Sequence, residues 1–133
     1  MANTEVEFCG LNFKNPVVVA SIEPTNSPDL IKQCFDAGAG GAIVKTLTDI
    51  EDMAQLTQNS KYAVMNAQGK IIHGKPAKDF VFYSRSGYAS TAYKDWIPYL
   101  KECQAYGAER GAHLIGSVGA KEIGGWRDIS RTI

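Results

Sequence analysis

Apolar and polar positions follow two different patterns along the first part of the chain. Two β-branched runs, VVVA at 17–20 and AIVKT at 42–46, lack the alternation of a half-exposed strand, which is typical of buried strands in a parallel sheet. Between them, Ser27 and Pro28 begin a segment whose apolar residues recur with the period of a helix, and Gly38 ends it. The pattern predicts a strand–helix–strand unit with short connections.

The same alternation returns after residue 90. A helix is expected from about Thr91 or Asp95 to Tyr106, and Pro98 fits such a helix only in its first turn. Its apolar face comprises Trp96, Ile97, Leu100 and Cys103. HLIGSV at 113–118 reads as a third core strand, and KEIGGWRDISRTI begins another helix. We expect adjacent parallel strands with two helices on one side: strands 17–20, 42–46 and 113–117, and helices near 28–37 and 95–106.

Two further regions do not follow this pattern. VEFCGLNF, residues 6–13, predicts a small hairpin, and residues 47–61 read as an acidic and polar loop. Tyr62–Met65 and Lys70–His73 are expected to pair as strands about a turn at 66–69. With FVFYS at 80–84 they form a long excursion, and long insertions in α/β proteins usually carry binding groups.

These elements predict an α/β fold whose order suits the opening of a (β/α)8 barrel or a doubly wound sheet. A closed barrel needs ~250 residues, so 133 residues would supply about half of one. No repeat or linker divides the chain. We therefore expect residues 1–133 to form one partial barrel domain with an inserted β-hairpin excursion. The domain would stop after its third strand and the start of its third helix.

Composition excludes several classes of protein. The chain is 44% hydrophobic and 21% charged, with 14 basic and 14 acidic residues, so no net charge attracts nucleic acid or an anionic membrane. No apolar run approaches the ~20 residues of a membrane span, and the N-terminus lacks the pattern of a signal peptide. Three widely spaced cysteines indicate reduced thiols in a cytoplasmic protein. His73 and His113 lack metal-site spacing, and common nucleotide, acyl-transfer and zinc motifs are absent.

Candidate chemistry lies where the expected strands end. In a barrel, function collects at the carboxyl ends of the strands. The residues there are Ala20 and Ser21, Lys45 and Thr46, and Ser117 with Gly119. A lysine that ends an apolar run costs free energy unless its charge is used. The alternative is a solvated lysine beside ordinary turn serines.

The segments LNFKNPVVVAS, a helix ending in AGAG, and GAIVKT together resemble the N-terminal half of the dihydroorotate and dihydropyrimidine dehydrogenase family. The resemblance extends over essentially the whole chain, and it implies an FMN-binding barrel. It places Ala20 and Ser21 against the flavin, Lys45 at the flavin ring and Thr46 beside it. Lys121 matches a second flavin-contacting lysine, and the strand-end residue Ser117 joins the expected cofactor-binding set.

Other matches concern the substrate. Asn59 matches an asparagine that contacts the pyrimidine in the dihydropyrimidine branch. Ser84, in FVFYSRSG, falls where the orotate enzymes have the asparagine of an NxMG segment, so the chain is more similar to the dihydropyrimidine branch. The family's NxSCP segment, its loop with the catalytic cysteine or serine, and its phosphate-binding loops would lie beyond residue 133. No catalytic residue is therefore expected here, because the three cysteines have packing explanations.

The leading hypothesis is a flavin-dependent oxidoreductase acting on the CH–CH bond of a small dihydropyrimidine, represented by a part that is inactive alone. Two alternatives stay open. The first is a barrel aldolase that uses Lys45 as a Schiff-base lysine. The second is a noncatalytic half-barrel that must associate with a partner chain or another copy, because its strand edges and helix faces would be uncovered.

Overall fold

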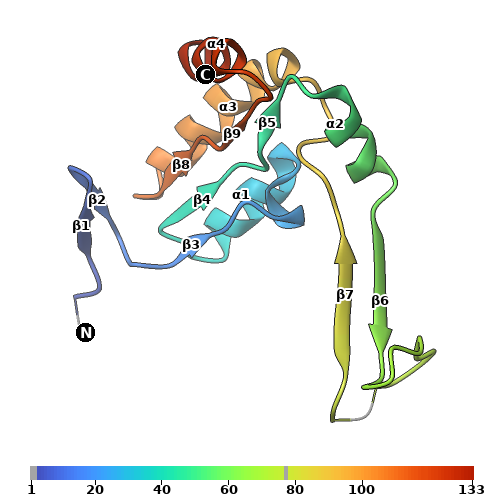
Figure 1. Ribbon diagram of the computed structural model, residues 1–133. Helices are drawn as coiled ribbons and strands as arrows, with labels where there is room; N and C mark the ends of the chain where they lie inside the picture. Colours follow the sequence, from blue (N-terminus) through green and yellow to red (C-terminus); the bar gives the residue numbers. More distant parts are fainter. Residues whose placement is uncertain (1–2, 77) are drawn as a thin grey trace.

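The computed structural model describes residues 3–76 and 78–133, which adopt a mixed α/β fold built on parallel strands (Figure 1). Three short strands form the central sheet in the order β3-β4-β8. They are β3 (Val18–Val19), β4 (Gly41–Ile43) and β8 (His113–Ile115). Both pairings are parallel, as the sequence predicted. Within the described ranges the sheets do not close into a barrel.

The second and third strands each continue after a break. β5 (Leu47–Thr48) follows β4 and β9 (Val118–Gly119) follows β8, and these two continuations pair in parallel. The expected strand 42–46 is thus wrong in its second half, because Lys45 and Thr46 lie in the break between β4 and β5. Backbone hydrogen bonds still span the break, from the Val44 amide to the Ile115 carbonyl (2.9 Å) and from the Leu47 amide to the Ser117 carbonyl (2.8 Å).

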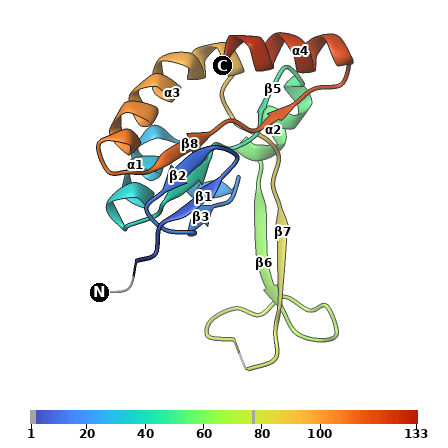
Figure 2. The ribbon, with the colours of Figure 1, turned by 90° about the vertical axis from the view of Figure 1, so that its left-hand side faces the viewer.

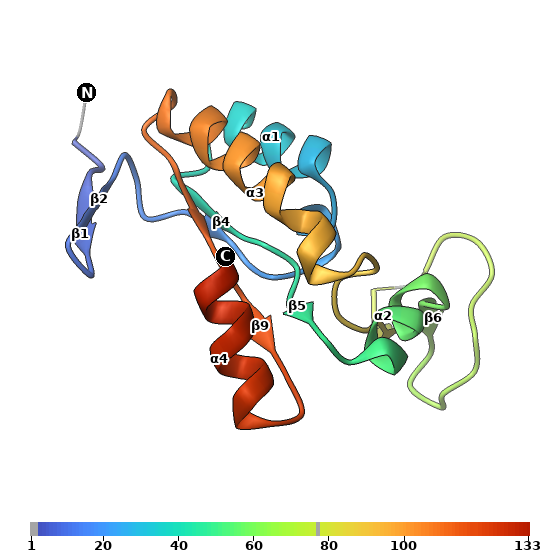
Figure 3. The ribbon, with the colours of Figure 1, turned by 90° about the horizontal axis from the view of Figure 1, so that it is seen from above.

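Two helices lie side by side on one face of the sheet, α1 (Pro28–Asp36) and α3 (Tyr93–Ala108), as Figure 3 shows from above. Ser27 caps α1 by accepting a hydrogen bond from the Leu30 amide. Gly107 allows the close approach of α3 to α1, because a Cβ there would lie 2.9 Å from the Phe35 ring. The expected placement of both helices on one side is confirmed.

Helix α3 begins earlier than its proline would suggest. Pro98 is the sixth residue of the helix, so the expectation that it must lie in the first turn is wrong. Its ring nitrogen cannot donate to the Lys94 carbonyl one turn before it. Helix α4 (Ile123–Thr132) follows β9, in agreement with the predicted start of another helix.

The core lies between the sheet and these helices. Its fully buried members include Ile31, Phe35, Ala42, Val44, Leu47, Cys103 and Ile129. The run at 17–20, expected to be buried, is not: Val17 is 60% exposed and Val18 38% exposed, and only Val19 packs against the core. The reason is that β3 is an edge strand of this sheet, and the helices cover a single face.

The N-terminal hairpin agrees with its prediction. β1 (Val6–Phe8) pairs antiparallel with β2 (Leu11–Phe13) around a turn in which Cys9 and Gly10 both have positive φ. The hairpin is held to the sheet by His113, whose Nε2 lies 2.8 Å from the Asn12 carbonyl oxygen.

The excursion after β5 differs from its prediction in two ways. Residues expected to be a loop form α2 (Glu51–Gln58), whose first-turn acidic residues favour a helix N-terminus. β6 (Lys61–Met65) pairs along its whole length with β7 (Val81–Arg85), because that register joins five residues on each strand. The expected partner segment 70–73 contributes a single bridge, Met65 to Ile71. Strands β6 and β7, hereafter the ribbon, project away from the sheet and its helices (Figure 2).

Among residues 3–76 and 78–133, no helix combines the length and the apolar character needed to cross a membrane.

Candidate functional site

Three hydroxyl groups meet at the carboxyl side of the three central strands. Ser21 Oγ lies 3.3 Å from Thr46 Oγ1, and Thr46 Oγ1 lies 2.9 Å from Ser117 Oγ. Each residue follows a different strand of the β3-β4-β8 sheet, so parallel pairing brings them together from positions far apart in the sequence. We call Ser21, Thr46 and Ser117 the hydroxyl row. All three residues are half-buried.

The turn after β3 makes hydrogen bonds to the residues next to the hydroxyl row. The short 3-10 helix η1 (Glu23–Thr25) brings the fully buried Thr25 back toward the strand end. Thr25 Oγ1 lies within hydrogen-bonding distance of the Ala20 carbonyl (3.3 Å), and the Thr25 carbonyl accepts a hydrogen bond from the Lys45 amide (2.9 Å). Ala20 itself is exposed beside the row.

Lys45 is buried, with only 6% of its surface exposed, and its ammonium makes hydrogen bonds to two side chains. Nζ donates to Glu23 Oε1 (3.1 Å) and to Ser86 Oγ (3.2 Å). Ser86 in turn donates to the same carboxylate oxygen of Glu23. We call these three residues the lysine triangle. It joins the turn after β3, the break in the second strand and the end of the ribbon.

The lysine triangle changes the acidity of its carboxyl group. The hydrogen bond from Ser86, with a further one from Lys45, lowers the pKa of Glu23 from 4.5 to about 2, against a smaller opposing effect of burial. Glu23 is therefore ionised at neutral pH and carries the negative charge opposite Lys45. Because its side chain is 45% exposed, solvent screens this pair partly.

Close packing fixes the position of Thr46. A Cβ on Gly119 would lie 3.0 Å from Thr46 Cγ2 and 2.9 Å from the Tyr88 ring. The Thr46 carbonyl also accepts a hydrogen bond from the Ala89 amide (2.8 Å). The glycine expected at this strand end is thus required by the close approach of Tyr88 and Thr46.

The remaining candidate residues do not join this cluster. Asn59 caps the C-terminus of α2, where its side-chain amide donates to the Gln55 carbonyl (3.1 Å). Lys121 is exposed and makes no hydrogen bond or ion pair with the described residues. Ser84 is an exposed residue of β7 opposite Tyr62. The structure therefore brings together Ser21, Lys45, Thr46 and Ser117, with Ala20 beside them.

Sequence reasoning missed Glu23 and Ser86. Glu23 lies only two residues after Ser21, in the polar loop that follows a strand, and this position could have marked it. Ser86 had no such signal, because its approach to Lys45 depends on how the ribbon returns to the sheet.

The thiols lie apart from the site. Cys9 is exposed in the hairpin turn, Cys34 is half-buried on α1 and Cys103 is buried on α3. Burial raises the pKa of Cys103 to about 11, so this thiol stays protonated and unreactive at neutral pH.

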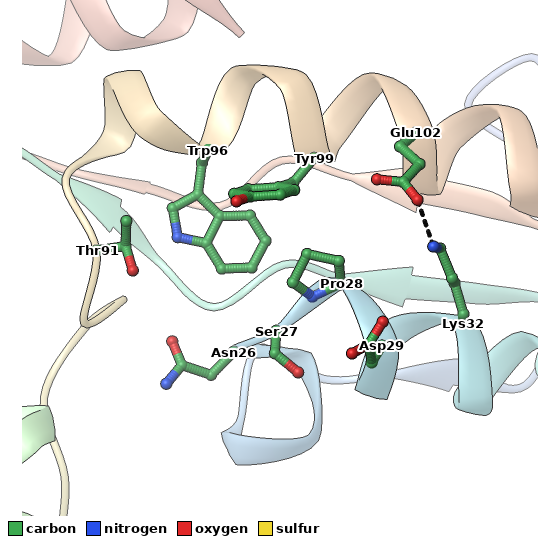
Figure 4. A pocket seen from close by; sticks show the side chains of 9 residues that line it. All are labelled: Asn26, Ser27, Pro28, Asp29, Lys32, Thr91, Trp96, Tyr99 and Glu102. Carbon is green, nitrogen blue, oxygen red and sulfur yellow. Dashed lines mark hydrogen bonds and ion pairs between the residues drawn. The ribbon is translucent and has the colours of Figure 1, made fainter.

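A separate hollow of about 350 Å³ lies between the start of α1 and the first half of α3 (Figure 4). Its lining includes Trp96, Tyr99 and the ion pair of Lys32 with Glu102. The indole Nε1 of Trp96 is buried without a hydrogen-bond partner among the described residues, and Figure 4 shows it turned toward Thr91. This hollow is on the helix side of the fold and shares no residue with the hydroxyl row or the lysine triangle.

The hydroxyl row and the lysine triangle together offer donors and acceptors to a ligand with a hydrogen-bonding edge. In the part of the chain that the structure describes, no three His, Cys, Asp or Glu side chains gather as a metal site would require. No protein-family model matches the chain.

Proposed function

We propose that this chain supplies the first three strands of an FMN-binding (β/α)8 barrel, in a flavin-dependent oxidoreductase acting on the CH–CH bond of dihydropyrimidines. The supporting observation is the convergence of Ser21, Thr46 and Ser117 beside Lys45 at the carboxyl ends of adjacent parallel strands. In barrels this is the side on which cofactor and substrate sites lie.

The chemistry of these groups fits the ring part of a flavin. The edge of the isoalloxazine presents oxygen and nitrogen atoms, and hydroxyl groups can both donate to and accept from such an edge. The exposed Ala20 has a small side chain that lets a flat ring approach the backbone. FMN, when bound, would supply hydride acceptance. The resemblance gives the residues named here to the ring of the flavin.

Within this proposal each residue has a limited task. The proposal gives the hydroxyl row the task of orienting the ring edge, and it assigns to the ligand the one N–H of the Lys45 ammonium that is not donated to Glu23 or Ser86. Orientation of this kind supplies part of a catalytic rate by holding reactants in place. The acid or base that moves the substrate proton is not assigned to any residue of this chain.

A titration with lumiflavin, an isoalloxazine without the ribityl phosphate, tests the proposal on the 133-residue chain. We expect the largest backbone NMR shift changes at residues 20–21, 45–46 and 117, and at least a tenfold weaker effect in Lys45→Ala. The matched control is Lys101→Ala, an exposed lysine on α3. Shifts spread evenly over the surface, or equal binding by Lys45→Ala, would contradict the proposed function.

Lys45→Ala also tests the proposed function in an active enzyme that contains this chain. Stopped-flow reduction of the bound flavin by a dihydropyrimidine should be much slower with Lys45→Ala at saturating FMN, and the loss of rate should be far larger than the loss of stability. A group that stabilises charge appearing in the reaction lowers the barrier more than it stabilises the ground state. Equal rates would end the assignment of Lys45 to the flavin.

The aldolase alternative has less support. A Schiff-base lysine needs an amine that is free to attack a carbonyl carbon, whereas Lys45 Nζ is held by Glu23 and Ser86. Borohydride trapping with a carbonyl substrate would give a covalent adduct at Lys45 if the aldolase alternative were correct.

One observation favours the second alternative, a noncatalytic part that associates with another chain. The chain exposes 8799 Å² of surface, whereas a compact monomer of 14.4 kDa exposes about 6,800 Å². The excess of about 2,000 Å² is more than the ~800 Å² that each partner buries in a standard interface. Sedimentation of the purified chain at several concentrations, with and without lumiflavin, separates a flavin-free assembly from a flavin-binding monomer.

A further inference from the structure

We propose that the hollow between α1 and α3 binds an uncharged sugar ring. We call this space the helix hollow; it measures about 350 Å³, which is within the range of about 300–1,000 Å³ for small-ligand sites. One wall comes from the residues that begin α1, and the other comes from α3 and from Thr91 just before it (Figure 4). The helix hollow shares no residue with the hydroxyl row or the lysine triangle. The inference therefore goes beyond the proposed function and does not depend on it.

A buried hydrogen-bond donor points to a ligand at this place. Trp96 is only 2% exposed, and its indole Nε1 has no hydrogen-bond partner among the described residues. Figure 4 shows this nitrogen turned toward Thr91, which also lines the helix hollow. The indole of Trp126, by contrast, donates to the Ala120 carbonyl (2.8 Å). Because a buried donor without an acceptor costs free energy, an acceptor atom of a ligand beside Trp96 would be stabilising.

Other polar groups of the helix hollow are also available to a ligand. The hydroxyl groups of Thr91 and Tyr99 and the carboxylate of Asp29 make no hydrogen bond or ion pair in the part of the chain that the structure describes. Ser27 Oγ accepts a hydrogen bond from the Leu30 amide (3.3 Å), which leaves its O–H to donate. The lining thus offers both donors and acceptors. Ligand hydroxyl groups match both, because each can donate and accept hydrogen bonds.

The apolar part of the lining suits the face of a ring. Tyr99 is 45% exposed, and its ring meets that of Trp96 edge to face, with the centroids 6.2 Å apart and the planes at 81°. Pro28 lines the helix hollow from α1. The C–H groups on one face of a sugar ring can pack on such surfaces, while the hydroxyl groups around the ring reach the polar partners. A ligand without a ring would leave Tyr99 and Pro28 uncovered.

The charges of the helix hollow disfavour an anionic ligand. Its charged side chains are Asp29, Lys32 and Glu102, two carboxylates and one ammonium, with a net charge of −1. The ammonium of Lys32 is already paired with the carboxylate of Glu102. A ligand carboxylate would therefore meet the charge of Asp29 without an unpaired cation in the lining to offset it. A cationic group cannot accept the N–H of Trp96, so an uncharged ligand fits both constraints.

The indole N–H resonance of Trp96, observed by NMR on the nitrogen-labelled chain, makes the test. Glucose, galactose and mannose are the uncharged probes, glucuronate is the anionic probe, and glycerol carries hydroxyl groups without a ring. Trp126→Phe assigns the two indole signals. We expect at least one of the three uncharged sugars to shift the Trp96 signal downfield with saturation, while the Trp126 signal stays in place. Glucuronate and glycerol should bind at least tenfold more weakly than that sugar.

Two variants test the lining residues one at a time. Trp96→Phe removes the indole N–H and keeps an aromatic ring, so the sugar should bind at least fivefold more weakly, as measured on the backbone amides of Ser27 and Asp29. Trp126→Phe, in α4, is the matched control and should bind the sugar as wild type does. Asp29→Asn removes a charge from an exposed residue and should reduce the discrimination against glucuronate at least threefold.

Three results would overturn the proposal. If none of the uncharged sugars shifts the Trp96 signal, solvent alone satisfies this N–H. If glucuronate or glycerol binds as tightly as the sugar, neither charge nor ring shape governs the helix hollow. If Trp96→Phe binds the sugar as tightly as wild type does, the indole N–H is not the donor that holds the ligand.

Discussion

The helix-backed sheet and the ribbon differ in how their apolar residues are used. In the sheet and its continuation into β5, Ala42, Val44 and Leu47 are fully buried in one cluster with residues of α1, α3 and α4. Every residue of β7 is exposed, including Phe82 and Tyr83. Apolar content alone therefore does not decide burial; the presence of a covering layer does.

The difference has a consequence for the candidate site, because the site joins the two regions. The hydroxyl row belongs to the sheet, and the lysine triangle receives Ser86 from the end of the ribbon. A two-stranded ribbon without a covering layer is marginally stable by itself. We expect the row to be rigid and the third member of the triangle to depend on a few contacts at the base of the ribbon.

Removal of one phenylalanine from each region tests this difference in burial most directly. Phe35→Ala, in the core between α1 and α3, should lower the free energy of unfolding by about 3–5 kcal/mol, because it leaves a large cavity. Phe82→Ala, at a side chain that is 60% exposed, should change it by less than about 0.5 kcal/mol.

Urea unfolding of both variants, followed by circular dichroism, makes this measurement. Should Phe82→Ala cost as much as Phe35→Ala, the ribbon would be buried in solution by another surface, and the second alternative for function would gain support.

The next largest effect on stability is expected from substitutions at two glycines. Gly119→Ala places a methyl group against Tyr88 and Thr46 and should cost about 1–3 kcal/mol, with loss of lumiflavin binding at the hydroxyl row. Gly124→Ala is the matched control in α4, where no atom lies within 4 Å of the added Cβ. It should stabilise the chain by about 0.5–1 kcal/mol, because alanine favours a helix. Thermal unfolding that ranked the two variants in the opposite order would contradict the close packing around Thr46.

Much of the sheet could be predicted from the sequence because its signals are local. The β-branched runs, the Ser27-Pro28 cap and the glycine stops are each read within a few residues, and the parallel order followed from short connections. The meeting of Ser21, Thr46 and Ser117 followed from that order as well. Exact strand ends did not, because at the break the Lys45 amide donates its hydrogen bond to the Thr25 carbonyl in the turn after β3.

The excursion was predicted less well because its pairing is not local. The turn at 66–69 suggested pairing of Tyr62–Met65 with the segment immediately after it, but β7 offers a longer register from about twenty residues away. Ser86 was missed for the same reason, since its partnership with Lys45 crosses from the sheet to the ribbon. Lys121 was chosen from the resemblance alone, and the structure gives it no partner among the described residues.

A smaller effect on stability is expected where the ribbon meets the sheet. Ser86→Ala removes two hydrogen bonds from the lysine triangle and should cost about 0.5–1.5 kcal/mol. It should also speed amide hydrogen exchange in β7 while leaving β4 unchanged. Ser84→Ala, two residues earlier on the exposed strand, is the control and should be neutral. Equal exchange rates in the two variants would mean that Ser86 does not anchor the ribbon.

The smallest expected effect is on the pH dependence of stability, through Glu23. Its folded-state pKa of about 2 lies below the ordinary value of 4.5, so ionised Glu23 stabilises the fold above pH 4.5, and this contribution is lost as the pH falls toward 2. Because the side chain is 45% exposed, the contribution should stay below about 1 kcal/mol. Unfolding of wild type and Glu23→Gln, measured between pH 6 and 2, should converge toward acid and differ at neutral pH. A constant difference across this range would show that the carboxyl group acts by packing, and the lysine triangle would then hold Lys45 without the charge of Glu23.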